Sequence, residues 1–523
     1  MTASIGPAEL RGMIGVGGEL ALVDVREELI FSQRHLLLAR SVPLSRLELK
    51  FAQLVPRGST RVVLCDDNDG LAERAAAILM RNGYPDTFVL EGGVDAWVAA
   101  GFEVFSGVNV PSKAFGEYIE HANGTPNISA DELEKLIRDK ANIVVLDSRP
   151  FDEYSRVSIP TGINVPGAEL VLRAREIAAS PETMVVVNCA GRTRSIIGAQ
   201  SLINAGLPNK VVALRNGTMG YSLAGFACDS GKNHRAPDVS AKTLDWAKQA
   251  AQKVAQDCGV ERIDRARFEV LRQDPQRTLY LFDVRDPDEY AAGHVSGAIS
   301  VPGGQLVQAT DQYVGTLGAR IVLVDDDEVR AAMTASWLRQ MGWKEVFVLV
   351  ESGTETGRPK APMLDGGPAS GEAIDASALK DLLSRDGATV IDLAMSRDYL
   401  AGHIPGAWFA IRTRLDRALK KIPLRGALVL TSEDGTLASL AAAEAKALVD
   451  APVRVLTGGN AAWQAAGYPL TKDAQMADEA VDQWRKPYER TGDTKAAMNE
   501  YLAWEIGLLP RIERDGSLKF SHH

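Results

Sequence analysis

Apolar residues along this chain fall in short continuous runs, and a stretch with helical spacing follows each of them. The run RVVLCDD at 61–67, for example, precedes the alanine-rich stretch AERAAAILMRNGY at 72–84. A run that is apolar throughout is typical of a strand covered by helices on both faces. Strands that alternate with helices in this way predict βαβ units around a parallel sheet.

Three such runs form a set that occurs four times. The first run leads into an Asp in each set, the second into a polar loop and the third into a glycine-containing turn. Because order, spacing and residue type recur together, we predict four homologous α/β domains in tandem, each a parallel sheet flanked by helices. The first runs lie at 21–28, 144–154, 280–290 and 390–400, and the second at 61–67, 184–191, 320–326 and 427–433.

The segments between and after the repeats predict linkers and a helical C-terminal tail. A helical linker is expected before domain 3, with Ser240 as its N-cap, and the Gly/Pro-rich segment 353–372 is expected to be a flexible connector. In the tail we expect helices at 478–490 and 496–509, whose aromatic side chains either pack on a neighbouring domain or bind a partner. The predicted boundaries are 1–108 (domain 1), 109–231 (domain 2), 232–258 (linker), 259–357 (domain 3), 368–472 (domain 4) and 473–523 (tail).

Composition narrows the class of protein. The 523 residues carry a formal net charge of -10, which argues against non-specific nucleic-acid binding, since that needs a positive field. No apolar run is long enough to span a membrane, and the N-terminal residues do not have the pattern of a secretory signal. The four cysteines form neither a disulfide framework nor a metal-binding cluster. We therefore expect a cytoplasmic protein without a metal or other cofactor.

The polar loop after the second run of domain 2 carries the candidate chemistry. It reads CAGRTRS from Cys189 to Ser195, and a strand that ends here before a helix would direct several backbone N–H groups at one point. The thiol of Cys189 would lie in a positive field that favours the thiolate, which is the nucleophile. We expect this loop to be exposed. Arg192 and Arg194 are expected to strengthen the field and to bind an anion, and Gly191 to allow close approach of a ligand.

The loop CAGRTRS resembles the six-residue active-site loop of the rhodaneses. The surrounding motifs are also similar: an Asp-x-Arg element at 147–149, IPTGINVPG at 159–167 and a late LxxGxxGY at 214–221. The resemblance extends over four domains, to about residue 472. It implies a sulfurtransferase in which Cys189 takes a sulfane sulfur from a small anionic donor and passes the persulfide sulfur to cyanide, a thiol or a protein acceptor. The persulfide would be held by the backbone of Ala190, Gly191, Arg192, Thr193 and Arg194.

The resemblance assigns roles to the Asp-x-Arg element, and at one place the sequence of domain 2 differs from the family pattern. Arg149 matches an arginine that can reach the substrate in two-domain members of the family, although it could equally form a salt bridge with its acidic neighbours. Asp147 is expected to be structural. Where many members carry Gly-His, domain 2 has Arg156-Val157-Ser158, and Arg156 could add positive charge near the site.

The other three domains lack the nucleophile. Their alignment with domain 2 places Cys65 opposite Asn188, inside a strand, and we expect it to be buried. The acidic loops of domains 1 and 3 would repel thiosulfate and could not form a persulfide. By the resemblance to two-domain rhodaneses, in which an inactive domain shapes the cleft of the active one, domains 1, 3 and 4 are expected to be inactive scaffolding for domain 2. Cys228 and Cys258 are expected to be bystanders, and His294 and His403 to be structural. The residues aligned with Cys189 are Asp66, Asp325 and Ser432.

Two other functional classes remain open at this point. A dual-specificity phosphatase or arsenate reductase shares a Cys-to-Arg loop, but only four residues separate Cys189 from Arg194, which suits sulfur better than a phosphoryl group. A non-catalytic scaffold or sulfur carrier that docks a partner protein is the other alternative. Within the sulfurtransferases, the two guanidinium groups favour thiosulfate over mercaptopyruvate as donor, because the mercaptopyruvate enzymes resemble one another in a neutral Cys-Gly-Ser-Gly loop.

Overall fold

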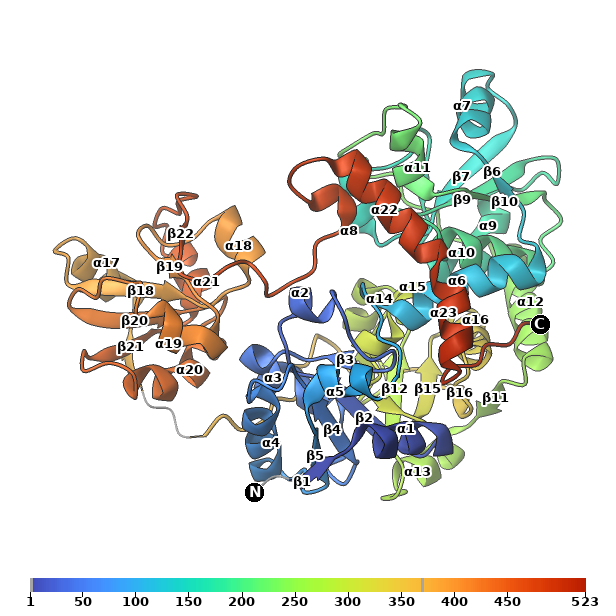
Figure 1. Ribbon diagram of the computed structural model, residues 1–523. Coiled ribbons are helices and arrows are strands. Elements are labelled where there is room, and N and C mark those ends of the chain that lie inside the picture. The colour runs from blue at the N-terminus through green and yellow to red at the C-terminus, as the bar shows by residue number, and fades with distance from the viewer. Residues whose placement is uncertain (1–2, 368–370) are drawn as a thin grey trace. The chain divides into compact units, whose positions relative to one another are not determined.

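A computed structural model describes residues 3–367 and 371–523 and contains four parallel sheets covered by helices (Figure 1). The predicted fold class is therefore confirmed. The predicted first residues of domains 1 and 4, Met1 and Pro368, lie outside the described residues. The chain divides into two compact units, which are described separately. Residues 3–7, 22–107 and 361–485 form the first, with domain 4 and most of domain 1. Residues 8–21, 108–360 and 486–523 form the second, with domains 2 and 3 and the end of the tail.

Domain 1 forms its sheet in the order β1-β5-β4-β2, with β3 beside β2. Its strands are β1 (Ala3–Ile5), β2 (Leu20–Asp24), β3 (Arg40–Ser41), β4 (Val62–Cys65) and β5 (Thr87–Leu90). Its helices are α1 (Pro7–Val16), α2 (Glu28–Phe31), the 3-10 turn η1 (Leu44–Arg46), α3 (Leu47–Leu54), α4 (Leu71–Arg81) and α5 (Gly93–Ala99).

Domain 2 repeats this plan in the order β6-β10-β9-β7-β8. Its strands are β6 (Asn127–Ile128), β7 (Ile143–Asp147), β8 (Ile163–Asn164), β9 (Met184–Asn188) and β10 (Val211–Leu214). Its helices are α6 (Val110–Asn123), α7 (Ala130–Arg138), α8 (Phe151–Arg156), the turn η2 (Gly167–Glu169), α9 (Leu170–Ile177), α10 (Thr193–Asn204) and α11 (Gly217–Leu223).

Domain 3 follows the helix α12 (Ala241–Asp257), whose N-cap Ser240 accepts the backbone N–H of Thr243, and has the order β11-β16-β15-β12-β13. Its strands are β11 (Glu261–Ile263), β12 (Leu279–Asp283), β13 (Ile299–Ser300), β15 (Arg320–Val324) and β16 (Val346–Leu349), and β14 (Thr316–Leu317) lies outside this sheet. Its helices are α13 (Arg265–Arg272), α14 (Pro287–Ala292), α15 (Gly303–Gln308), the turn η3 (Thr310–Gln312) and α16 (Val329–Gln340).

Domain 4 has the order β17-β21-β20-β18-β19-β22. Its strands are β17 (Glu372–Ile374), β18 (Ala388–Asp392), β19 (Trp408–Phe409), β20 (Ala427–Thr431), β21 (Val453–Leu456) and β22 (Gln475–Met476). Its helices are α17 (Ala376–Leu383), α18 (Ser396–Ala401), the turn η4 (Arg412–Arg414), α19 (Leu415–Ala418), α20 (Thr436–Lys446) and α21 (Gly459–Ala465).

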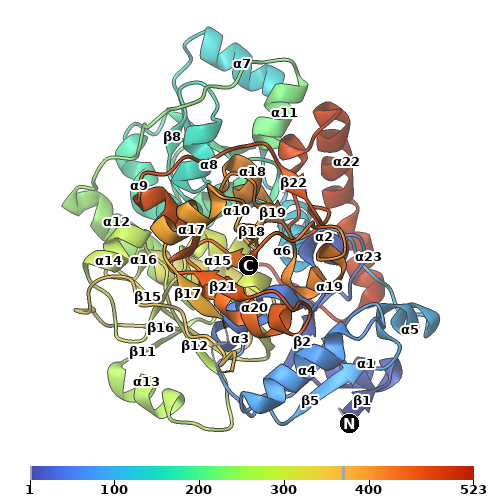
Figure 2. The ribbon, with the colours of Figure 1, turned by 90° about the vertical axis from the view of Figure 1, so that its left-hand side faces the viewer.

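The tail differs from the prediction in its first half. Residues 478–490 were expected to form a helix, but they are irregular apart from the turn η5 (Pro487–Glu489), and Pro487 would interrupt a helix at this point. The second half is helical, as α22 (Thr494–Ile506) and α23 (Leu508–Asp515). Both helices contact α6 of domain 2, and Figures 1 and 2 show them running beside it.

The sheet of domain 2 explains how the candidate loop is held. Strand β9 lies in the interior of the sheet, between β7 and β10, and pairs with both in parallel register. Its central residues Val185, Val186 and Val187 are completely buried, because helices cover both faces of the strand. The loop after Asn188 therefore starts from a rigid element. No helix in the described part of the chain is long and apolar enough to cross a bilayer.

Candidate active site

The loop between β9 and α10 forms a cradle of backbone donors. Cys189 follows the last residue of β9, and α10 begins at Thr193. Among the described residues, the backbone N–H groups of Ala190, Gly191 and Arg192 have no hydrogen-bond partner. The first N–H groups of α10 add the positive end of the helix dipole. The loop can therefore bind an anionic sulfur atom through its backbone.

The thiol at the start of this loop is buried. Cys189 is only 2% exposed, and its thiol donates to Ser195 Oγ at 3.4 Å. The Ser195 hydroxyl in turn donates to the carbonyl oxygen of Arg192 at 2.8 Å. The expectation of an exposed loop is wrong, because side chains from the tail lie over it, as described below.

Arg192 does not offer its guanidinium to a ligand. Its Nε and Nη2 donate to the two carboxylate oxygens of Glu117 at 2.6 and 2.8 Å, and Nη2 also pairs with Glu120. Nη1 donates to Asn216 Oδ1 at 3.2 Å. Burial by itself would lower the pKa of Arg192, but the bonds and charge of Glu117 raise it above its ordinary value. The side chain thus anchors the loop to α6 and leaves anion binding to the backbone.

Arg194 interacts electrostatically with Cys189 and is also paired with a carboxylate. Its Nη2 donates to Glu153 Oε2 at 2.9 Å, and its Nη1 donates to Gln305 Oε1 of domain 3 at 3.2 Å. Lys486 of the tail is 3.1 Å from the same carboxylate. Burial alone would raise the pKa of Glu153, but Arg194 and Lys486 hold it well below its ordinary value. Burial by itself would lower the pKa of Arg194, but Glu153 and then the charge of Cys189 raise it above its ordinary value.

Arg149 forms a fork with its own Asp147, at 2.9 Å from Nε and 2.6 Å from Nη2. Because the same fork recurs in domains that lack the nucleophile, it is first of all a structural bond. The equivalent pairs are Arg26 with Asp24 and Arg285 with Asp283.

The third nitrogen of this arginine differs between the domains. In domains 1 and 3 it faces the acidic residue that follows the cysteine position, and in domain 2 that residue is Ala190. Among the described residues, Arg149 Nη1 has no hydrogen-bond partner, so it is available to an anion. The occupied pairs are Arg26 Nη1 with Asp67 at 2.8 Å and Arg285 Nη1 with Asp326 at 3.5 Å.

In the other three domains the side chain at the cysteine position bonds backbone N–H groups of its loop or of the helix that follows. Asp66 accepts the backbone N–H groups of Asn68 and Ala72, both at 2.9 Å. These residues align with Gly191 and Ser195 of domain 2. In domains 1 and 3 the aspartate thus occupies a donor whose equivalent in domain 2 is open to an anion. The corresponding bonds are Asp325 with the N–H groups of Glu328, Arg330 and Ala331, and Ser432 with that of Ala438.

The tail contributes side chains to the site that the sequence did not indicate. On α22, Met498 and Leu502 form a buried cluster with Met219 of α11. Tyr501 lies near the thiol, since burial and then the charges of Glu505 and Cys189 raise its pKa. The i, i+4 spacing of Met498 and Leu502 could have identified a buried helix face, but no local signal connects that face with Cys189.

Several other candidates singled out in the sequence are either paired or buried. Arg156 is 51% exposed and pairs with Glu489 of the tail at 3.1 Å, so its charge is neutralised. Cys65 is completely buried, as predicted. Burial raises the pKa of the Cys228 and Cys258 thiols.

His294 of domain 3 and His403 of domain 4 have structural contacts. His294 stacks on Tyr290 with ring centroids 3.9 Å apart, and His403 stacks on Tyr399 at 3.8 Å. Each Nδ1 also hydrogen-bonds the backbone oxygen of the same tyrosine. Among the described residues, no group of His, Cys, Asp or Glu side chains could hold a metal ion.

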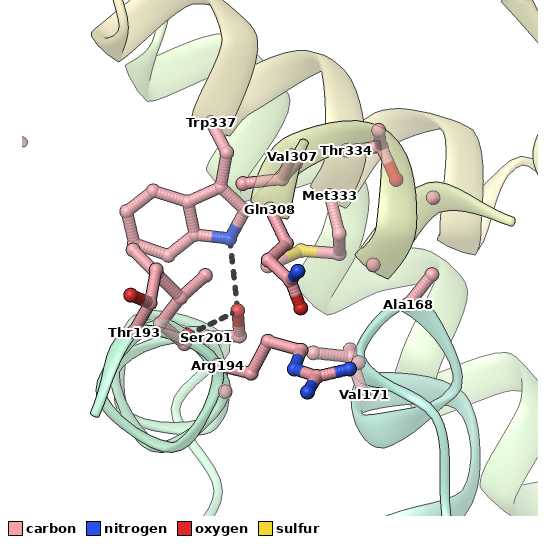
Figure 3. Close-up of a pocket in the computed structure, with 15 residues that line it drawn as sticks. Ala168, Val171, Thr193, Arg194, Ser201, Val307, Gln308, Met333, Thr334 and Trp337 are labelled. Carbon is pink, nitrogen blue, oxygen red and sulfur yellow. Dashed lines mark hydrogen bonds between the residues drawn. The ribbon is translucent and has the colours of Figure 1, made fainter. Parts of the chain in front are cut away.

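Behind the loop, a pocket lies where α10 meets domain 3 (Figure 3). Arg194 enters it from the active-site loop, and Trp337 closes it by donating its indole N–H to Ser201 Oγ at 2.9 Å. Close backbone contact holds the two domains together here, since the Cβ that a side chain would place on Gly304 would lie 3.1 Å from Gly167. Domain 3 thus packs against α10, the helix that follows the active-site loop.

Comparisons with known proteins agree with this geometry. The Rhodanese-like domain family matches residues 6–100, 129–224, 266–355 and 375–466. The crystal structure of a thiosulfate sulfurtransferase from Pseudomonas aeruginosa is 47% identical, covers 99% of both chains and has a TM-score of 0.96.

More distant curated relatives match single segments. A putative sulfur carrier protein of Bacillus subtilis is 26% identical over 19% of this chain and 54% of its own length. The centrosomal protein of 41 kDa from Gallus gallus is 34% identical over 14% of this chain and 22% of its own length. The chain therefore matches only about a quarter of the length of one of these two relatives and about half of the other.

Proposed function

Because this chain belongs to the rhodanese-like family, which matches it in four segments, we propose that it is a sulfurtransferase with its single working site at Cys189. The observation that carries the proposal is the cradle of N–H groups at Ala190, Gly191 and Arg192. Among the described residues, these three N–H groups have no partner in domain 2, whereas in domains 1 and 3 the aspartate at the cysteine position accepts the N–H of Asn68 or Glu328, which align with Gly191 and Arg192. Domains 1, 3 and 4 are then scaffolding.

The reaction follows from the groups that surround the thiol. The Cys189 thiolate attacks the outer sulfur of thiosulfate, the S–S bond of the donor breaks, and sulfite leaves with the electron pair. The persulfide anion is held by the backbone N–H groups of residues 190–194 and by the charge of Arg194. An acceptor, cyanide or a thiol, then attacks the outer sulfur, and the electron pair of the breaking bond restores the Cys189 thiolate.

Thiosulfate is the donor that we propose, as in the name of the similar Pseudomonas aeruginosa enzyme. Since Arg192 and Arg194 are paired with carboxylates, the groups that remain for the sulfonate end are the loop backbone and Arg149 Nη1. We expect thiosulfate to exceed mercaptopyruvate by at least about tenfold in kcat/KM, or about 1.4 kcal/mol of differential binding. Release of thiocyanate from cyanide with each donor measures this ratio, and faster turnover with mercaptopyruvate would refute the choice of donor.

Arg194 should tune the thiol. Arg194→Ala removes the cation that interacts with Cys189 and leaves the partly buried Glu153 carboxylate with Lys486 as its partner, so we expect the thiolate to be disfavoured. We expect alkylation of Cys189 by iodoacetamide to move to higher pH, and kcat/KM to fall by an amount equivalent to about 2–4 kcal/mol. Arg156→Ala, which removes an exposed arginine of the same domain, is the matched control. An unchanged alkylation profile in Arg194→Ala would show that Arg194 does not act on the thiol.

The cellular setting is proposed from the cysteines. All four are unbridged, which is what a reducing cytoplasm maintains. The partners that we propose are the small donor anion and a thiophilic acceptor, which could also be a protein. A chain that loads sulfur at Cys189 but passes it only to a partner protein would be a sulfur carrier, and the thiocyanate assay separates that function from the enzyme.

A further inference from the structure

Glu505, on the tail helix α22, is a buried carboxylate that the proposed reaction has not yet used. Its side chain is 1% exposed. Oε1 accepts the hydroxyl of Thr193, the first residue of α10, at 2.7 Å and lies 3.6 Å from Lys113 Nζ. Within the described part of the chain, Oε2 has no hydrogen-bond partner. One oxygen therefore ties the tail to the loop, and the other is free.

The free oxygen faces the loop that would hold the persulfide. A Cβ placed on Gly191 would lie 3.4 Å from Glu505 Oε2 and 3.7 Å from Tyr501 Cε1. The same position is 2.9 Å from Met219 Cε. Because Gly191 has no side chain, the Glu505 carboxylate can approach the loop backbone at this residue, which is two residues after Cys189.

A buried carboxylate oxygen without a hydrogen-bond donor lowers the stability of the fold. A buried acceptor without a donor loses about 1–3 kcal/mol relative to one that is satisfied, so native structures contain few of them. The charged neighbours that act on Glu505 are Lys113 and Arg192, which are cations, and Glu117, which is an anion. A ligand that donates a hydrogen at the loop would satisfy Oε2, whereas a donor anion such as thiosulfate could not.

We propose that Glu505 is the proton acceptor for a thiol that receives sulfur from the Cys189 persulfide. The proposal rests on the function proposed above. The thiol sulfur of the acceptor attacks the outer sulfur and forms the new S–S bond, while its proton moves to Glu505 Oε2. The bond from the outer sulfur to Cys189 Sγ breaks, and its electron pair remains on Sγ as the thiolate. The acceptor leaves as a persulfide anion, and Glu505 later returns the proton to water.

Cyanide provides an internal comparison. The cyanide anion attacks through a carbon lone pair and carries no proton, so its reaction has no step for Glu505. A carboxylate that only held the loop in place would affect thiol and cyanide acceptors alike. The ratio of the two discharge rates therefore separates proton transfer from a structural role.

The test uses the full chain with Glu505→Gln, in which the amide oxygen can still accept the Thr193 hydroxyl. Cys189 is first loaded with thiosulfate, and the added sulfur atom is verified by mass spectrometry. Discharge is then followed at one pH with 2-mercaptoethanol and with cyanide. We expect the thiol-to-cyanide rate ratio to fall at least about tenfold, since general acid–base catalysis contributes about 10²–10⁴-fold.

Control variants make the result decisive. Glu500→Gln changes an exposed carboxylate of the same helix and should keep the wild-type ratio. If Glu505→Gln does not fold, Glu505→Asp retains the carboxylate but withdraws it, and an intermediate ratio is expected. A wild-type ratio in the folded Glu505 variant overturns the role of Glu505. Absence of sulfur on wild-type Cys189 overturns the proposed function instead.

Discussion

Cys189→Ser should abolish sulfur transfer, because a hydroxyl at this position cannot form the persulfide. The serine can keep the hydrogen bond to Ser195 Oγ that the thiol makes at 3.4 Å. Since the site is buried and not exposed, we expect a cost of about 1–2 kcal/mol in the free energy of unfolding. The assay is thiocyanate release from thiosulfate and cyanide, combined with mass spectrometry of the loaded protein.

Cys65→Ser is the control for this result. Cys65 is the last residue of β4, is completely buried and is followed by Asp66, which occupies the cysteine position of domain 1. We expect Cys65→Ser to retain sulfur transfer per folded molecule. Activity that survives in Cys189→Ser but is lost in Cys65→Ser would mean that the working site lies in domain 1.

Arg192→Met should be the most destabilising single substitution in the loop. The guanidinium is bonded to Glu117, whose side chain is even more buried, and to Glu120. Removal of one partner from a buried ion pair leaves an uncompensated charge and costs about 3–5 kcal/mol. Burial already raises the pKa of Glu117, and Arg192 opposes this, so the carboxyl should become protonated in the variant. Native-state hydrogen exchange of α10 amides measures the loss of stability where it occurs.

The double variant Arg192→Met, Glu117→Gln tests the cause. It removes both members of the pair, so we expect it to recover part of the stability that the single variant loses. Arg156→Ala, at an exposed pair, should change stability by less than about 1 kcal/mol. If Arg192→Met leaves α10 as protected as in the wild type, then the ion pair with Glu117 does not anchor the loop.

The sequence alone was sufficient to predict the four repeated sheets and the active-site loop, because the signals for both lie in neighbouring residues. Four sets of apolar runs predicted four parallel sheets, because strand burial appears directly as an unbroken apolar run. The loop after β9 was identified because Cys189, Gly191 and Arg194 follow one strand within six residues. The same alignment placed Asp66 and Asp325 at the cysteine position, where they indeed occupy the N–H groups of their loops.

Only the tertiary structure decided what surrounds that loop. Arg192 was expected to bind an anion, but its partner Glu117 lies 75 residues away in sequence, and Thr193 meets Glu505 across 312 residues. The sequence does not show which residue a charged side chain will pair with. Whether that side chain binds a ligand or another side chain depends on which helices pack against it. For the same reason the exposure of Cys189 could not be predicted: the helix that covers it begins after domain 4, and its position is set by long-range packing that local periodicity does not encode.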